Sequence, residues 1–348
     1  MRAMIIKEFR ELRRDRRTMA MLIALPILLL VVFGYAASFD VTSIPTATLG
    51  PAAGQIEDLL PDLFDVKTVD VSGTDEDARN LLRDGTVDVA ITTDARPATA
   101  YVDGSGLFTA QAAVSVLGRA GDIVEVEVLY NPDLTTAWVL VPGITGLILM
   151  FIGTVVTAIG LVRERENGTL EQLAVMPLSP SSIILGKIVP YFVVASVDML
   201  IVTIVGVLLF DVPFNGSILL FGLGAALFLF VVLGIGVFIS TVSQNSGQAI
   251  QLAFFFLLPQ ILLSGMIFPL EAMPWGVRWI SYFLPLTYYI KIALGVMLRD
   301  AGLDSLWPAY LVLTVMAVLV FVGATMRFRR DLAPSRRSRS EAVEGASP

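Results

Sequence analysis

The sequence predicts an α-helical polytopic membrane protein with six transmembrane helices, a re-entrant segment and a small α/β extracytoplasmic domain between spans 1 and 2. Three observations lead to this fold class. First, 55% of the 348 residues are hydrophobic and only 16% are charged, whereas soluble domains have about 45–50% and about 25%. The mean hydropathy is +0.78. The other two observations are a series of long uncharged runs and one strongly acidic segment.

Uncharged runs define the spans, because a helix needs roughly 20 apolar residues to cross a bilayer. Runs of 22, 29 and 22 residues cover 18–39, 134–162 and 305–326. A further run of 59 residues, 212–270, is too long for one crossing, and the polar patch STVSQNSGQ at 240–248 divides it into two. The predicted spans are 18–39, 138–162, 183–210, 217–241, 249–270 and 305–326.

The segment 271–304 is predicted to be re-entrant or extracytoplasmic. It contains Pro285 and Lys291, and its uncharged pieces are too short to span. Irregular backbone at membrane depth is tolerated where protein surrounds it. Seven Lys or Arg in residues 1–17 and six Arg in the tail 327–348 place both termini in the cytoplasm by the positive-inside rule. We therefore expect a multi-pass plasma (inner) membrane protein with an even number of crossings.

Residues 40–137 form the sizeable water-facing unit. They contain 17 acidic and 5 basic residues, a net charge of −12, so the rest of the chain carries +5 within the total of −7. Apolar stretches at 47–49, 66–71, 87–92, 99–102 and 123–129 alternate with helix-like runs at 55–60, 75–83 and 108–119. Strands that alternate with helices predict a small α/β domain.

The chain contains no cysteine and no histidine. Their absence excludes disulfides, thiol nucleophiles, Cys/His zinc sites and His-dependent triads. We expect no catalytic residue, no metal site and no cofactor bound by this chain. Nothing in the sequence indicates a nucleic-acid partner.

The N-terminal segment 1–17 has the pattern of a basic amphipathic helix on the cytoplasmic membrane surface. Ile5, Phe9 and Leu12 recur at i, i+4 and i+7 while the other faces are charged. The helix is either a topology signal alone or a docking element for a cytoplasmic partner.

The cytoplasmic loop 163–182 follows the second span and reads RERENGTLEQLAVMPLSP over 163–180. Thr169 and Gln172 have the spacing of a capping box, and Pro177 ends the helix that they would start. This run resembles the coupling-loop signature of ABC-2-type transporter permeases, the membrane subunits of ABC exporters of the multidrug, lipid and hemolysin-efflux kind. Similar family elements are LGKIVPY (185–191), LLSGMIFPLEAMP (262–274) and LPLTYYIKIALGVMLRD (284–300). The last departs from the family pattern at Leu294 and Asp300.

The resemblance implies that two permeases pair, as a second copy or a paralogue, and that each docks an ATP-binding cassette subunit. No G-x-x-x-x-G-K-[ST] motif occurs, so ATP and Mg would belong to the partner chain. The residues implied to couple this chain to the ATPase subunit are Arg163, Glu164, Arg165, Glu166, Gly168, Thr169, Leu170, Glu171 and Leu173.

Asp198 is the sole acid inside a predicted span, and such a residue is a functional candidate because a buried charge is costly. It could pair with Lys187 or a neighbouring helix, bind a cation, line the substrate path, or serve as a structural acid. Small residues four apart, as in the pairs Gly222 with Ala226 and Gly236 with Ser240, predict close helix packing. The residues expected to form an outer gate or a rigid plug are Gly265, Pro269, Pro274 and Pro285.

The leading hypothesis is an ATP-driven export permease for an amphiphilic substrate, either drug-like, lipid or lipid-linked. The alternatives are a cation (Na⁺-type) exporter of the same architecture, with Asp198 as an ion ligand, and a membrane sensor or scaffold that uses the external domain. A membrane-embedded hydrolase is disfavoured because one isolated acid is not a catalytic dyad.

Overall fold

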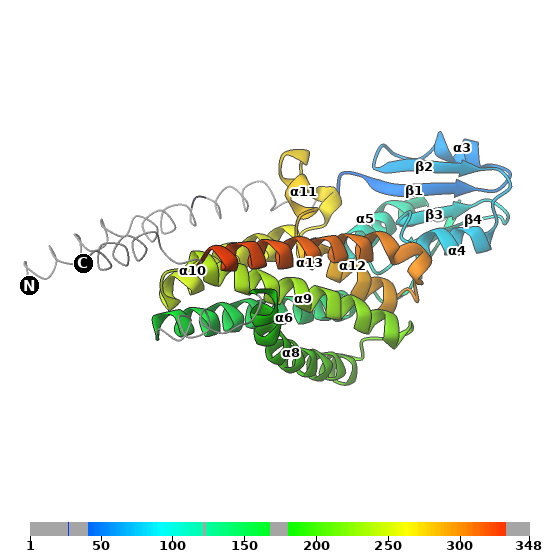
Figure 1. The fold of residues 1–348 in the computed structure, drawn as a ribbon. Helices are drawn as coiled ribbons and strands as arrows, with labels where there is room; N and C mark the ends of the chain where they lie inside the picture. Colours follow the sequence, from blue (N-terminus) through cyan, green and yellow to red (C-terminus); the bar gives the residue numbers. More distant parts are fainter. Residues whose placement is uncertain (1–26, 28–40, 121–122, 168–179, 332–348) are drawn as a thin grey trace, which may run out of the picture.

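The computed structural model describes residues 41–120, 123–167 and 180–331, together with Ile27. Within these residues, a small α/β domain lies at one end of an elongated helical bundle (Figure 1). The predicted span 18–39, the amphipathic helix with Ile5, Phe9 and Leu12, loop residues 168–179 and the tail beyond 331 lie outside the described residues.

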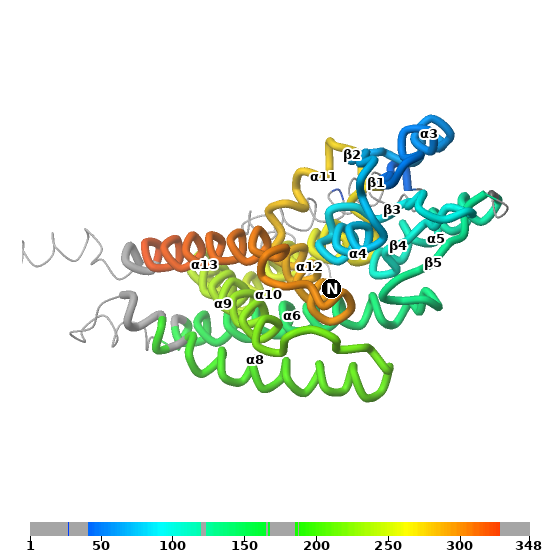
Figure 2. The backbone as a smooth tube through the Cα atoms, turned by 90° about the vertical axis from the view of Figure 1, so that its right-hand side faces the viewer, coloured from blue at the N-terminus to red at the C-terminus, as the bar shows by residue number. Residues whose placement is uncertain are grey.

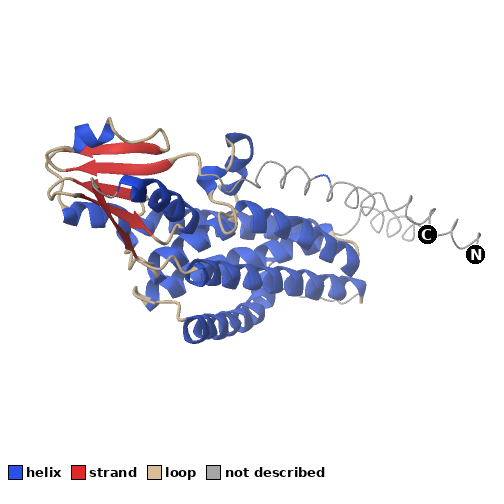
Figure 3. Cartoon of the chain, turned by 180° about the vertical axis from the view of Figure 1, so that it is seen from behind, coloured by secondary structure: helices blue, strands red, loops and turns tan. Residues whose placement is uncertain are grey.

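The α/β domain is built on one five-stranded sheet with the order β2-β1-β3-β4-β5. Strand β4 is antiparallel to β3, and all other neighbours are parallel. The strands are β1 (Ile44–Leu49), β2 (Phe64–Asp70), β3 (Val89–Thr92), β4 (Ala98–Asp103) and β5 (Val124–Leu129). The helices are α3 (Ala53–Glu57), α4 (Asp75–Arg83), α5 (Leu107–Leu117) and the 3₁₀ turn η1 (Gly118–Ala120). The small α/β domain that the sequence predicts is thus present (Figure 3).

Both faces of the central strands are covered. One hydrophobic cluster includes Val89, Val102 and the apolar side of α5, and the other includes Ala90, Tyr101 and Leu82 of α4. Because consecutive side chains of a strand point to opposite faces, a strand that is covered on both sides buries every residue and is mostly apolar. This explains why all four residues of β3 are buried.

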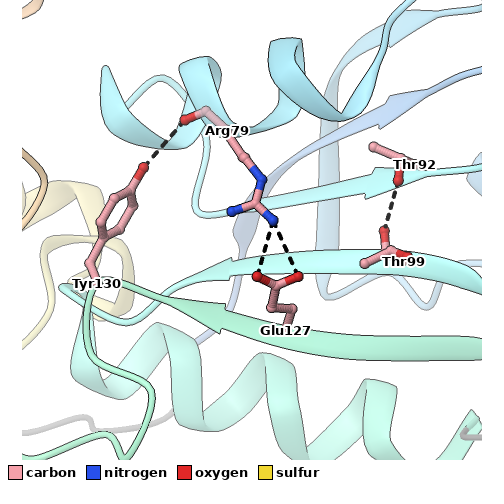
Figure 4. A network of polar contacts seen from close by, with 5 residues as sticks. All are labelled: Arg79, Thr92, Thr99, Glu127 and Tyr130. Carbon is pink, nitrogen blue, oxygen red and sulfur yellow. Dashed lines mark hydrogen bonds and ion pairs between the residues drawn. The ribbon is translucent and has the colours of Figure 1, made fainter.

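Helix α4 is fixed to the sheet by polar contacts on the second of these faces (Figure 4). The Arg79 guanidinium donates to both carboxylate oxygens of Glu127 on β5, at 3.1 and 3.4 Å, and lies 4.6 Å from the centre of the Tyr101 ring. The Tyr130 hydroxyl donates to the Arg79 carbonyl oxygen at 3.3 Å. These contacts join α4 to the strand that leads into the membrane helices.

Five described helices are long and apolar enough to cross a membrane, and a bent helix pair could make a sixth span. The long helices are α6 (Thr136–Glu166), α8 (Pro180–Phe210), α9 (Ile218–Val242), α10 (Ser246–Leu263) and α13 (Leu303–Asp331). The bent pair consists of α11 (Trp275–Ser281) and α12 (Pro285–Met297), which meet at 75° after the short turn η2 (Leu270–Ala272). The chain is therefore polytopic, and the count of six spans with a re-entrant segment remains a prediction.

Helix α9 is the most buried of the long helices and α8 the least. Figure 2 shows α8 along one side of the bundle, and the hydrophobic core is formed mainly by α6, α9, α12 and α13. A Cβ at Gly236 would lie 2.8 Å from the Thr154 carbonyl oxygen, so this glycine permits the close contact of α9 with α6 that the small-residue pattern predicts. Gly222 differs, because its Cβ would meet nothing within 4 Å.

Helix α10 ends at Leu263, short of the predicted boundary at 270. Gly265 adopts φ +89°, a left-handed conformation that favours glycine, and Pro269 follows before η2. The chain therefore leaves the helix early and turns back toward the bundle. Gly265 and Pro269 are residues that often end a helix, but the span was predicted from the uncharged run, which continues to residue 270.

Candidate functional site

Three polar places interrupt the apolar bundle. One lies at the end remote from the α/β domain, where α6 ends and α10 begins (Figure 1). The second is a cavity beside Asp198 on α8. The third lies where the α/β domain meets α10 and α12.

At the remote end, Glu166 joins α6 to α10. Its carboxylate accepts hydrogen bonds from the backbone N–H of Ser246 at 3.0 Å and from the Ser246 hydroxyl at 2.8 Å. These two bonds, the backbone one first, lower the pKa of Glu166. Ser246 is the first residue of α10, and a carboxylate is favoured there because the first N–H groups of a helix lack internal partners.

The turn between α9 and α10 is itself ordered by side chains. Asn245 caps α10 by accepting from the N–H of Gln248 at 2.9 Å, and the Gln248 side-chain oxygen accepts from the N–H of Gln244 at 3.1 Å. The polar patch that divides the long uncharged run thus forms a capped helix start. Its bond to Glu166 was missed, because the two residues lie 80 positions apart.

The predicted coupling residues divide into two groups in the structure. Arg163, Glu164, Arg165 and Glu166 form the last turn of α6 rather than a loop. The other five, Gly168, Thr169, Leu170, Glu171 and Leu173, lie outside the described residues. What is visible is therefore the entrance to the predicted loop, and Glu166 is the residue that fastens it.

Asp198 is half-buried near the middle of the apolar part of α8. It lines a cavity of about 250 Å³ between α8, α6 and α9. Among the described residues, no hydrogen bond or ion pair to its carboxylate is found. The other lining residues are Ile152, Gly153, Val156, Thr157, Tyr191, Val194, Ala195 and Leu233.

At the third place, a cavity of about 180 Å³ separates the α/β domain from α10 and α12. Asp103, at the end of β4, receives a hydrogen bond from Arg299 at 3.3 Å, and only 3% and 13% of these two side chains are exposed. Asp88 lines the same cavity, and burial raises its pKa to about 7. This buried ion pair ties the domain to the segment after α12.

The predicted gate residues are not all in one place. Gly265 and Pro269 line this cavity beside the α/β domain, whereas Pro274 precedes α11 and Pro285 is the first residue of α12. Proline suits the first position of a helix, since its missing N–H would have no partner there. The Gln260 side chain accepts from the N–H of Leu286 at 3.3 Å and so connects α10 with the start of α12.

Comparison with known proteins gives this arrangement a family. A model of the ABC-2 family transporter protein matches residues 16–326. The chain is 34% identical over 203 residues to the probable multidrug ABC transporter permease YbhR of Escherichia coli, and 36% identical over 215 residues to the inner membrane transport permease YhhJ of the same organism. These matches cover 58% and 60% of this chain but only 55% and 56% of the relatives.

A third relative matches over nearly its whole length. The probable multidrug ABC transporter permease YbhS of E. coli is 26% identical over 362 residues, which cover 93% of this chain and 95% of the relative. The family model spans the α/β domain, the long helices and the bent pair alike. The chain is therefore a member of the ABC-2 family, a multi-pass permease of the ABC transporter class.

Proposed function

We propose that this chain is the permease subunit of an ATP-binding cassette exporter, driven by ATP hydrolysis in a separate subunit. It would move an amphiphilic substrate out of the cytoplasm or the inner leaflet, and would pair with a second copy or a paralogue. The observation that carries the proposal beyond family membership is the bond of Glu166 to Ser246.

This bond offers a route for motion. The last turn of α6 leads into the predicted coupling loop, and Glu166 fastens that turn to the first residue of α10. Helix α10 then runs through the bundle to the turn at Gly265 and contacts the start of α12 through Gln260. If an ATPase subunit displaced the loop, helix α10 would therefore transmit the displacement to the cavity beside the α/β domain.

The nature of the substrate is inferred from the surface of α8. An apolar groove of about 490 Å³ lies between α8 and α9, with Phe192, Met199 and Phe221 among its walls. The cavity with Asp198 uses a neighbouring face of the same helix. An apolar groove close to a single charge favours an amphiphile. A bare metal cation is a less favoured substrate, because the described residues contain no group of three or more acidic side chains able to hold a metal ion.

The test is the ratio of transport to ATP hydrolysis in proteoliposomes that contain the permease with its ATPase subunit. We expect Glu166→Gln and Ser246→Ala each to lower transport per ATP, because each change weakens the hydrogen bonding that joins the last turn of α6 to the start of α10. The Glu164/Glu166 double alanine variant is expected to do the same. Asn167→Ala, at the adjacent exposed position, is the matched control. Unchanged ratios in both Glu166→Gln and Ser246→Ala would overturn the proposed coupling route.

A further inference from the structure

We propose that the cavity beside Asp198 binds the charged head of an organic cation whose apolar body remains against the lipid-facing side of α8. The inference rests on the proposed export function and specifies its substrate class. It favours an amphiphilic cation over both a neutral lipid and an inorganic ion.

The cavity is built by three helices. Asp198, Val194 and Tyr191 lie one turn apart along α8, Thr157 comes from α6 and Leu233 from α9. A Cβ at Gly160 would collide with the Tyr191 hydroxyl, so the absence of a side chain at this position allows the Tyr191 ring to lie against α6. The cavity thus has one acidic wall and one aromatic residue in an otherwise apolar and small-residue lining.

Two polar groups in this cavity lack partners among the described residues. No hydrogen bond or ion pair is found there for the Asp198 carboxylate. Thr157 is fully buried, and its hydroxyl oxygen has no hydrogen-bond partner in the described part of the chain. A buried polar group is nearly always paired, which makes the Thr157 hydroxyl an exception. An acid within an apolar span is costly when it has no partner, even where it is half-buried as Asp198 is. The two groups together indicate a missing ligand.

Charge and shape together select the ligand. A carboxylate in the middle of an apolar span, as Asp198 is, attracts a cation strongly, because the effective dielectric constant there is lower than in water. An aromatic ring adds attraction for an organic ammonium or phosphonium group. The described lining offers few oxygen atoms, whereas hard inorganic cations require about six.

The rim shows where the rest of the ligand would lie. Val194, Val156 and Ile152 line the cavity, and 68%, 47% and 40% of their surfaces are exposed. Val194 belongs to α8, and Val156 and Ile152 belong to α6. The cavity therefore opens onto an exposed apolar surface that these two helices share in the described structure. A ligand can therefore place its cationic head beside Asp198 and keep its apolar body in the membrane.

The test is equilibrium binding of tritiated tetraphenylphosphonium to the purified full chain in detergent. We expect saturable binding that weakens at least about tenfold in Asp198→Asn, since the carboxylate supplies the attraction, and that is retained in Asp198→Glu. Triphenylphosphine oxide, which is neutral and of similar bulk, should not compete. Asp211→Asn removes an exposed acid directly after the same helix and is the matched control.

Val194→Trp provides an independent variant in case Asp198→Asn does not fold. It keeps the carboxylate but fills the rim, so it should also abolish binding. No saturable binding by the wild-type chain, full affinity in a folded Asp198→Asn variant, or full affinity in Val194→Trp would each overturn the inference. The binding assay needs no ATP hydrolysis. If the purified chain retains an ATPase subunit but does not bind the cation, the cation site is rejected while the proposed export function stands.

Discussion

Asp88 makes the stability of the α/β domain depend on pH. It lies directly before β3 and lines the cavity between the α/β domain and helices α10 and α12. The pKa of its carboxyl is raised to about 7, first by burial and then by the negative charges of Asp103 and Glu271, while Arg299 and Lys291 act in the opposite direction. The perturbation that tests this is a change of pH, compared between the wild type and Asp88→Asn.

The magnitude follows from the two pKa values. An aspartate carboxyl has a pKa of about 3.9 in an unfolded chain, against about 7 for folded Asp88. Between these values the folded state holds a proton that the unfolded state has released, so stability falls as the pH rises from about 4 to about 7. The whole shift corresponds to about 4 kcal/mol, of which about 2–3 kcal/mol is lost between about pH 5 and about pH 8.

Hydrogen exchange of the β3 and β4 amides in the full chain measures this, after correction for the intrinsic pH dependence of exchange. The wild type should lose protection as the pH rises, and Asp88→Asn should lose much less. Asp94→Asn removes an exposed carboxylate from the same domain and should keep the wild-type pH dependence, because Asp88 is still present. Equal slopes in the wild type and Asp88→Asn would refute the reasoning.

Three further predictions concern helix packing and the ion pair that joins the α/β domain to the segment after α12. Gly146→Ala places a methyl group against the Tyr289 ring and should cost about 1–3 kcal/mol through overpacking, seen as a lower thermal midpoint. Gly222→Ala faces open space and should leave the midpoint unchanged; equal midpoints in both variants would contradict the packing. Asp103→Asn should cost about 3 kcal/mol, because it leaves Arg299 buried without its partner. Adding Arg299→Gln should cost less than the sum, and strict additivity would show that the two side chains do not interact.

The elements of the α/β domain could be predicted because each has a local signal. The apolar stretch at 87–92 contains β3, and the run 75–83 coincides with α4, whose start is fixed by the Thr74 capping box. The order of the strands could not be predicted. Strands β4 and β5 run opposite to β1, β2 and β3, so that β3 and β4 form the antiparallel pair of the sheet. No residue in the sequence specifies which neighbours pair.

For the candidate sites, single residues could be identified from the sequence, but their neighbours in space could not. Glu166 and Asp198 were identifiable, one from the family pattern and the other because it is an acid in an apolar span. Their surroundings were not, because they depend on distant residues: Ser246 for Glu166, and Thr157 for Asp198. Asp88 had one local signal that was missed, namely a charged residue between Val87 and Val89, which are both buried.

The most direct test of the central claim is purification of the full chain from native membranes, followed by identification and ATPase assay of what accompanies it. We expect a P-loop ATPase subunit to accompany the chain in stoichiometric amount. We also expect Gly168→Pro, within the predicted coupling loop, to release or silence that subunit while the spans remain folded. A chain that purifies without any ATPase, or a Gly168→Pro complex that hydrolyses ATP and transports normally, would contradict the central claim.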